Sequence, residues 1–183
     1  MKRRAAWGIT GSGDKLRETL DSMEAVRRDL QDVDVEVFLS KSGETVLKYY
    51  RLFERLKDIF GKVWVERSAN SPFLAGRLQL GEFDFLLIAP ATSNTVAKIA
   101  HGIADTLITS SAIMALKAMV PVHVMPTDFS EGKMISKLPD GRDLRLRVRR
   151  EDVQNVEKLA KMDDVHLLQR PEEIIQLFKN YYE

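Results

Sequence analysis

The chain has 183 residues, of which 44% are hydrophobic and 30% charged, proportions that are ordinary for one globular domain with a sizeable core. Its formal net charge of +1 gives no general reason to expect nucleic acid or an anionic membrane as a partner. Cysteine is absent, which excludes disulfides, a thiol nucleophile and thiolate ligands for an iron–sulfur cluster of the chain's own. Any redox chemistry therefore needs a bound organic cofactor or a metal.

Several further features bear on domain organisation and compartment. No apolar run reaches the roughly 18 to 20 residues that span a bilayer, and the first residues lead directly into a predicted strand. We therefore expect a cytoplasmic protein with no membrane partner. No internal repeat, linker or low-complexity segment marks a second domain. The sequence predicts a single domain over residues 1–183, with a C-terminal extension from about residue 132.

Strands and helices are predicted to alternate along the chain. Apolar runs predict strands, in chain order, at residues 5–10, 33–39, 63–66, 83–88, 120–125 and 165–168. Helical periodicity predicts helices at about residues 16–30, 41–60, 96–103, 106–118, 152–161 and 172–182. Between residues 132 and 141 the pattern weakens. Regular alternation of this kind favours an α/β fold, with a doubly wound parallel sheet in a three-layer arrangement.

The turn after the first strand is rich in glycine. Gly11, Ser12 and Gly13 follow a strand and open a helix, so backbone N–H groups and the positive helix end there can bind a phosphate. The turn is an incomplete G-x-G-x-x-G, because Leu16 stands where the third glycine would be, and the second strand ends at Ser40 instead of an acidic residue. The pattern favours a mononucleotide over NAD. Taken alone, it is equally compatible with a tight turn.

The fourth predicted strand leads into a cluster of small polar side chains. Residues 83–88 are an apolar run typical of a central strand covered on both faces, and Pro90 is expected to end it. Residues 92–95 read Thr-Ser-Asn-Thr and follow at the carboxyl end of the strand, where open α/β sheets bind their ligands. Thr92 or Ser93 can cap the next helix. Such a site suits a flat ring with polar edges.

The stretch from Ala89 to Asp105 reads Ala-Pro-Ala-Thr-Ser-Asn-Thr-Val-Ala-Lys-Ile-Ala-His-Gly-Ile-Ala-Asp. It resembles the Pro-Ala-Ser-Ala-Asn-Thr motif, with its trailing Ala-Lys and Gly-x-Ala-Asp, of the homo-oligomeric flavin-containing cysteine decarboxylase superfamily. Thr92 and Ser93 replace the Ser and Ala of that motif. The likeness extends in order over about residues 4–130, and its details are most similar to archaeoflavoproteins and flavin-dependent dihydromethanopterin reductases. It implies a Rossmann-like flavoprotein fold.

In that family the motif contacts FMN, so the resemblance implies FMN as the cofactor of this chain. It also implies that Ser40 and Ser42 share the phosphate or the ribityl chain with Ser12. The loop at Ser68 either covers the flavin or is a polar loop before a helix that starts at Pro72. The predicted cofactor-binding set is Gly11, Ser12, Gly13, Ser40, Ser42, Ser68, Ala91, Thr92, Ser93, Asn94 and Thr95.

No side chain is assigned a catalytic or metal-binding role. His101, His123 and His166 lack metal-ligand spacing, and packing or surface roles are the preferred interpretation. Decarboxylating relatives use a histidine near the second helix or third strand, whereas residues 34–100 contain none. Their Pro-x-Met-Asn segment after the fifth strand is matched here only in its proline. Asp128 in this loop is interpreted as a turn or capping residue.

Two classes of function fit these observations. Resemblance to archaeoflavoproteins implies an FMN-binding redox protein that passes electrons from a ferredoxin-like donor to an iron–sulfur flavoprotein. Resemblance to the reductases implies a pterin acceptor instead. The alternative is a flavin-dependent decarboxylase of a cysteinyl or phosphopantothenoylcysteine-like substrate, or a prenyltransferase-like enzyme, and the missing histidine weakens it. Family members are trimers or dodecamers, so we expect a homo-oligomer with FMN near a subunit interface.

Some large side chains are assigned to the interior. Trp7 and Trp64 lie on predicted strands and are expected to be buried. Met114 and Met119 are expected in the core, because methionine readily fills irregular gaps there.

Overall fold

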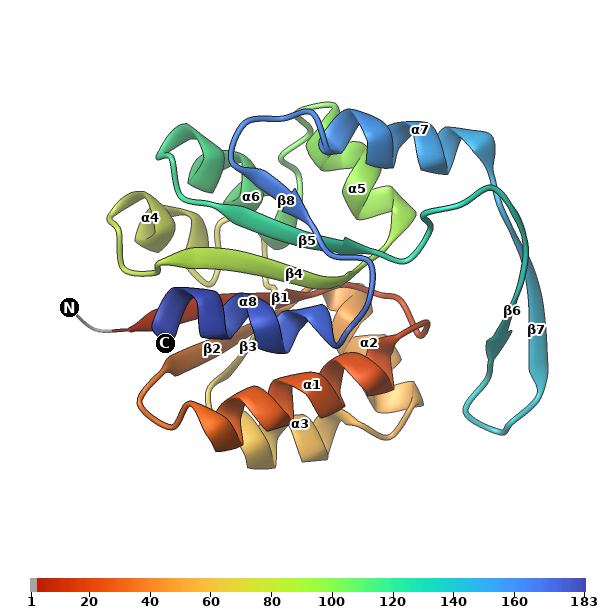
Figure 1. Ribbon diagram of the computed structural model, residues 1–183, viewed down its shortest axis with the longest axis horizontal. Helices are drawn as coiled ribbons and strands as arrows, with labels where there is room; N and C mark the ends of the chain where they lie inside the picture. The colour runs from red at the N-terminus through yellow and green to blue at the C-terminus, as the bar shows by residue number, and fades with distance from the viewer. Residues whose placement is uncertain (1–2) are drawn as a thin grey trace.

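The computed structural model describes residues 3–183, and the strands of its main sheet are all parallel (Figure 1). Their order across the sheet is β3 (Val63–Val65), β2 (Asp34–Leu39), β1 (Arg4–Ile9), β4 (Phe85–Ala91), β5 (Val122–Pro126) and β8 (Val165–Leu167). The chain winds outward from β1 to β3, then crosses back to β4 and winds the other way. This doubly wound parallel sheet confirms the predicted fold class. Ligands bind at such a reversal of strand order, here between β1 and β4.

Helices cover both faces of the sheet and give three layers (Figure 1). One face packs against α1 (Leu16–Asp29), α2 (Lys41–Tyr49), α3 (Phe53–Phe60) and α8 (Glu173–Tyr182). The other face packs against α4 (Leu74–Gln79), α5 (Ser93–Ala100), α6 (Leu107–Lys117) and α7 (Arg150–Leu159). No helix within residues 3–183 is long and apolar enough to cross a membrane.

Alternate residues of the central strands feed two separate cores. Trp7 and Phe85 point to the core beneath α1 and α8, whereas Phe38 and Leu86 point to the core beneath α4–α7. All four side chains are at most 1% exposed. Burial on both faces explains why β4 is a continuous apolar run, and burying each such side chain contributes about 1.5–3 kcal/mol.

The single helix predicted over residues 41–60 is wrong, because the chain breaks there into α2 and α3. The N–H of Leu52 bonds to the carbonyl of Leu47 at 2.9 Å, and that of Arg51 to the carbonyl of Lys48 at 3.0 Å. These two bonds form a Schellman motif, which ends a helix with one residue in the left-handed conformation. That residue is Arg51, with φ of +58°. Glycine usually occupies this position, so an arginine hides the break from sequence analysis.

The expectation that Pro90 ends the fourth strand is also wrong, since β4 continues to Ala91. Its register against β5 shifts between Ile88 and Ala91. The carbonyl groups there bond instead toward β1: Trp7 Nε1 donates to the oxygen of Ala89, and Thr10 Oγ1 to that of Pro90, both at 2.8 Å. Proline lacks an N–H but keeps its carbonyl, so the end of β4 stays attached to β1.

The weak pattern after residue 132 corresponds to an antiparallel hairpin that sequence analysis missed. Strands β6 (Gly132–Lys137) and β7 (Asp143–Val148) project beyond the carboxyl ends of the main sheet, at the right of Figure 1. Most of their side chains are exposed, and β6 shows no alternation of apolar and polar residues. Strand β7 does alternate, with Leu144, Leu146 and Val148 between charged residues, but this signal stands alone in the sequence without a recognisable partner strand. After the hairpin the chain returns to the main body, where α7 packs on α5, β8 pairs with β5 and α8 packs on α1.

Two of the residues expected in the interior lie at the surface. Trp7 is 1% exposed, as expected, but Trp64 is 42% exposed because β3 is an edge strand. Met119 is 79% exposed. It has φ of +57° and follows the end of α6, where the N–H of Val120 bonds to the carbonyl of Ala115. Its side chain therefore points away from the core that α6 covers.

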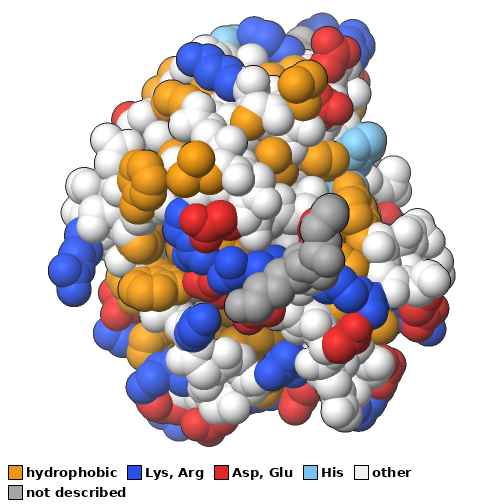
Figure 2. Space-filling model, turned by 90° about the vertical axis from the view of Figure 1, so that its left-hand side faces the viewer, with side chains coloured by type: hydrophobic (Ala, Val, Ile, Leu, Met, Phe, Trp, Pro, Cys, Tyr) orange, Lys and Arg blue, Asp and Glu red, His pale blue; other side chains and the backbone are white. Residues whose placement is uncertain are grey.

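A buried ion-pair network lies toward the amino ends of the strands. Glu36 is 2% exposed and accepts hydrogen bonds from Arg77 at 2.7 and 3.0 Å and from Trp64 Nε1 at 3.0 Å; Arg4 also pairs with it. Burial alone would raise the pKa of Glu36, but these bonds and the charges of Arg77 and Arg4 lower it to about 2. Figure 2 shows this end of the molecule, where acidic and basic side chains mix with hydrophobic ones.

Candidate functional site

A cleft of about 520 Å³, which we call the main cleft, opens at the carboxyl ends of the central strands. Its walls come from the ends of β1 and β4 and from the first turns of three helices. Most of its lining residues are polar or charged: Thr10, Gly11, Ser40, Lys41, Ser42, Glu66, Thr92, Asn94, Thr95, Lys98, Asp105, Thr106, Ile108 and Thr109. The cleft lies where the strand order reverses, which is the usual ligand position in this architecture.

Three capped helix N-termini meet at the main cleft. Ser40 caps α2, Thr92 caps α5 and Thr106 caps α6. Each hydroxyl accepts a bond from the backbone N–H three residues later, at 2.9, 3.2 and 3.2 Å respectively. Each N-terminus carries the positive end of a helix dipole, so the three together favour an anion in the cleft.

Several donors at these N-termini have no protein partner. Within residues 3–183, the backbone N–H groups of Ser42, Ser93 and Asn94 bond to no acceptor. Glu66 takes two other N–H groups, those of Lys41 at 3.0 Å and of Leu107 at 2.9 Å. The cleft therefore combines free donors with two carboxylates that have protein partners, Glu66 and Asp105, an arrangement that suits a ligand with a phosphate and a polar-edged ring.

The glycine-rich turn forms one wall through close packing. A Cβ on Gly11 would lie 2.6 Å from the Cβ of Ser42, and one on Gly13 would lie 2.4 Å from the phenolic oxygen of Tyr50. Both distances are far below van der Waals contact, so a side chain at Gly11 would push the N-terminus of α2 away from the turn, and one at Gly13 would displace the ring of Tyr50. Gly11 thus lets the turn pack directly against the N-terminus of α2, and Gly13 lets it pack on the ring of Tyr50 after the end of that helix.

A second space of about 360 Å³, the side cleft, adjoins the main cleft and shares Gly11, Thr92 and Asn94 with it. Its remaining walls are Ser12, Gly13, Asp14, Tyr50, Ser93, Thr127 and Asp128 from the main body, and Met134, Ser136, Leu144 and Leu146 from the hairpin. Ser93 Oγ donates a hydrogen bond to Asp128 Oδ2. The structure thus places Asp128 against the proposed ligand motif.

Asp14 adds a perturbed carboxyl to the side cleft. Burial raises its pKa, Lys15 opposes this, and the nearby carboxylates of Glu18 and Asp128 add to the rise. The carboxyl group of Asp14 therefore holds a proton more firmly than an exposed aspartate does.

The predicted cofactor-binding set meets at these two clefts except for two residues. Ala91 is fully buried at the end of β4, where its carbonyl accepts a bond from Thr127 N at 3.1 Å. Ser68 is exposed and lines neither cleft. Its backbone exchanges two hydrogen bonds with Ser71, at 3.1 and 3.2 Å, which hold it in a separate turn. Ser68 therefore lies apart from the nine predicted residues that line the clefts.

Sequence analysis missed part of the lining. Lys98 and Asp105 were present in the quoted motif, in its Ala-Lys and Gly-x-Ala-Asp parts; both line the main cleft and form an ion pair at 2.9 Å. Thr106 follows directly. Glu66 ends the predicted strand 63–66, at the carboxyl edge where ligands bind, and this position could have pointed to it. The hairpin residues carried no such signal, because only the tertiary fold brings them to the side cleft.

The histidines lie away from both clefts. His123 is buried, and its Nε2 is 3.0 Å from the hydroxyl of Tyr181. Burial, reinforced by the neighbouring His166, lowers the pKa of His123 to about 4. In the part of the chain that the structure describes, no group of three or more His, Cys, Asp or Glu side chains is arranged to hold a metal ion.

Comparison with known proteins gives consistent matches over nearly the whole chain. Residues 1–178 match the family described as Flavoprotein. The chain is 46% identical over 180 residues to an uncharacterized protein of Methanocaldococcus jannaschii, covering 98% of this chain and 96% of that one. It is 30% identical over 238 residues to a dihydromethanopterin reductase (acceptor) of the same organism, covering 97% and 96% respectively.

A solved structure matches equally widely. DmrB from Burkholderia xenovorans, in complex with FMN and described as a cubic protein cage for redox transfer, superposes with a TM-score of 0.82 at 33% identity. The match covers 98% of this chain and 94% of that one. Together with the family match, it confirms the resemblance seen in residues 89–105.

Proposed function

This chain belongs to the flavoprotein family, and on that premise we propose that its main cleft binds FMN and that the protein carries electrons from a donor to an acceptor. When bound, FMN supplies the one- and two-electron chemistry that the side chains of this protein lack. The observation that carries the proposal is the meeting of three capped helix N-termini, at Ser40, Thr92 and Thr106, around one cleft.

The residues present fit a flavin mononucleotide. Beside the Gly11–Gly13 turn, the N-terminus of α2 offers the free N–H of Ser42 to a phosphate. The N-terminus of α5 offers the N–H groups of Ser93 and Asn94 to the polar edge of a ring. A volume of about 520 Å³ lies within the usual range for cofactor pockets.

The donor and the acceptor must come from outside the chain. Without cysteine, this protein cannot hold an iron–sulfur cluster through thiolates of its own. We infer a ferredoxin-like protein as the donor, and an iron–sulfur flavoprotein or a dihydropterin as the acceptor. Similarity over nearly the full length to a protein named dihydromethanopterin reductase supports the pterin.

We further propose that the protein works as a homo-oligomer, a trimer or an assembly of trimers such as a dodecamer. Support comes from the cubic cage described for DmrB, which is 33% identical to this chain. Light scattering of the FMN-loaded protein at micromolar concentration should give a mass that is a multiple of three chains. A monomeric mass would contradict this part of the proposal.

The test of the redox proposal is an anaerobic titration. The protein is reconstituted with FMN, reduced with ferredoxin while the visible absorbance is followed, and then mixed with a dihydropterin or an iron–sulfur flavoprotein. We expect bleaching by ferredoxin and recovery of the absorbance with one of the two acceptors. Asn94→Ala should weaken FMN binding, whereas Asn155→Ala, on α7, should leave it unchanged. A protein that retains no FMN, or whose FMN ferredoxin cannot bleach, would rule the proposal out.

A further inference from the structure

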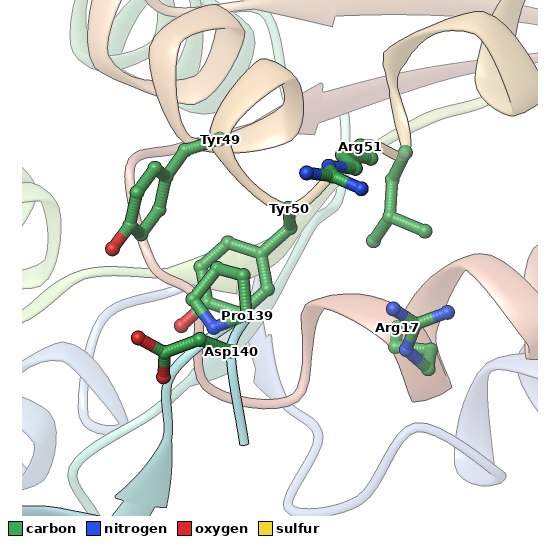
Figure 3. A pocket seen from close by; sticks show the side chains of 7 residues that line it. Arg17, Tyr49, Tyr50, Arg51, Pro139 and Asp140 are labelled. Carbon is green, nitrogen blue, oxygen red and sulfur yellow. The ribbon is translucent and has the colours of Figure 1, made fainter. Parts of the chain in front are cut away.

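A pocket of about 640 Å³ lies beyond the side cleft, between α1, the junction of α2 with α3 and the tip of the hairpin (Figure 3). We call it the arginine pocket. Its lining residues are Arg17, Tyr49, Tyr50, Arg51, Leu52, Pro139 and Asp140. Figure 3 shows the guanidinium groups of Arg17 and Arg51 on one side of this space, and the rings of Tyr49 and Tyr50 with Asp140 on the other.

The two arginines are unmatched cations. Their side chains make no ion pair or hydrogen bond with any residue between 3 and 183, although other arginines of the chain, such as Arg55 and Arg77, are paired. Asp140 does not neutralise them, because it is bound to Arg142 at 2.7 Å. Two free guanidinium groups facing one concave space favour a carboxylate or a phosphate.

The arginine pocket and the side cleft both adjoin a third pocket. This pocket of about 360 Å³ shares Gly13, Asp14, Tyr50 and Ser136 with the side cleft, and Arg17, Tyr50 and Pro139 with the arginine pocket. We call these three adjoining spaces, which lie along the hairpin, the trench. Tyr50 borders all three, with its ring against Gly13.

We propose that this trench binds an elongated small-molecule acceptor, whose flat ring lies in the side cleft and whose tethered carboxylate or phosphate is held by Arg17 and Arg51. This inference rests on the proposed redox function, because it places the acceptor beside the main cleft. A small molecule fits better than an acidic protein, since the trench is concave and lies along the hairpin. The tyrosine rings supply flat apolar walls for the linker between ring and anion.

The test uses the FMN-loaded full-length chain and two probes that share one ring. Dihydrofolate carries a tail with two carboxylates, whereas 6-methyl-7,8-dihydropterin has no tail. Binding to the oxidised protein is followed by calorimetry. We expect dihydrofolate to bind at least about 10-fold more tightly, equivalent to about 1.4 kcal/mol. In the double variant Arg17→Gln/Arg51→Gln this preference should vanish, while the affinity for FMN is unchanged.

Control variants and competing ligands test whether the preference depends on Arg17 and Arg51 in particular. Arg28→Gln, an exposed residue of α1 that pairs with Asp29, should keep the preference. Displacement of dihydrofolate by p-aminobenzoylglutamate or by inorganic phosphate tells which anion the arginines prefer. The proposal is overturned if the tailed probe binds no more tightly than the tail-less one, whether both bind or neither does, or if the preference survives in the double variant.

Two further outcomes show whether the acceptor site or the redox function itself is wrong. If the double variant keeps the preference and is instead reduced more slowly by ferredoxin, the arginines dock an acidic protein. FMN binding and bleaching by ferredoxin are measured before any probe is added. If either does not occur, the proposed redox function is itself contradicted. If both occur but the tailed probe binds no more tightly than the tail-less one, only the proposal of an acceptor site in the trench is contradicted.

Discussion

The phenolic oxygen of Tyr50 donates a hydrogen bond to the main-chain carbonyl of Lys137, 3.0 Å away. The two residues are 87 positions apart in sequence, one at the end of α2 and the other at the end of β6. The ring of Tyr50 also packs on Gly13. One side chain therefore links the hairpin that lines the trench to the glycine-rich turn of the main cleft.

Tyr50→Phe removes this bond and keeps the ring. A single hydrogen bond contributes about 1 kcal/mol, so the hairpin should open about 5-fold more often. Hydrogen exchange of residues 132–148 should accelerate by that factor, while the dissociation constant of FMN changes less than about 2-fold. Tyr49→Phe is the matched control, because Tyr49 is 57% exposed and its hydroxyl bonds to nothing in the described chain. Equal exchange in the wild type and Tyr50→Phe would show that the bond does not hold the hairpin.

Gly11→Ala tests the close packing at the main cleft. The added Cβ would meet Ser42 at 2.6 Å, so the turn and α2 must separate. We expect FMN to bind at least about 10-fold more weakly and the free energy of unfolding to fall by about 1–3 kcal/mol, as overpacking usually costs. FMN fluorescence quenching and urea denaturation measure the two effects.

Gly81→Ala provides the control for a loss of stability alone. Gly81 has φ of +69° with open space around it, and it lies after α4, away from the cleft. A side chain there strains the backbone by about 1–2 kcal/mol. FMN binding should stay unchanged in this variant. If it weakened as much as in Gly11→Ala, the effect of Gly11→Ala would reflect stability and not the geometry of the cleft.

His123 should make the protein less stable in mild acid. Its pKa in the folded state is about 4, against 6.5 for an ordinary histidine, so the unfolded chain binds the proton more readily between these values. The contribution of neutral His123 to the free energy of unfolding is therefore fully present above pH 6.5, and about 3 kcal/mol is lost as the pH drops to 4. Urea denaturation across this range should show a shallower loss in His123→Gln. His101→Gln, on the surface, should retain the wild-type slope.

Glu36 should affect the stability of the protein over a separate, more acidic pH range than His123 does. Its pKa is lowered from 4.5 to about 2, so the folded state keeps this carboxylate charged where the unfolded chain is already protonated. Its contribution is present above pH 4.5 and is lost by about pH 2; the difference corresponds to about 3 kcal/mol. Glu36→Gln should lose a similar amount at pH 7, because the partly buried Arg4 and Arg77 lose the buried carboxylate that they share and keep only the more exposed Asp34 and Glu82.

The control for Glu36 is Glu44→Gln, which removes an exposed pair with Lys48 on α2. Such pairs contribute about 0.3–0.5 kcal/mol, so this variant should unfold almost like the wild type. A loss of comparable size in both variants would mean that net charge, and not the buried network, sets the acid stability.

The sequence was sufficient to predict the six strands of the main sheet, but not the break between α2 and α3 or the hairpin. Strand β4 is apolar throughout because both its faces are covered, and that pattern is local. The break at Arg51 could not be predicted, since an arginine takes a conformation that glycine usually marks. The hairpin was missed because β6 carries no alternating pattern, so the alternation of Leu144, Leu146 and Val148 in β7 had no recognisable partner strand.

The same distinction holds for the candidate site. Residues 11–13 and 92–95 were predictable because each group follows a recognisable strand directly in sequence. Glu66 was not assigned to it, although it ends the predicted strand 63–66 at the same edge of the sheet. Tyr50 was not assigned to it, because its position depends on how α2 and the hairpin pack. Ser68 was assigned from its place at the end of a strand, and its exchange of bonds with Ser71 takes it elsewhere.

The left-handed backbone at Arg51 implies that stability and recognition conflict at this position. An L-residue is strained there, so Arg51→Gly should raise the free energy of unfolding by about 0.5–1 kcal/mol, even though it deletes a large side chain. The same variant removes half of the cationic wall of the arginine pocket. If the protein becomes more heat-resistant and loses its preference for the tailed probe, then the chain carries a permanent conformational strain in order to place one guanidinium group.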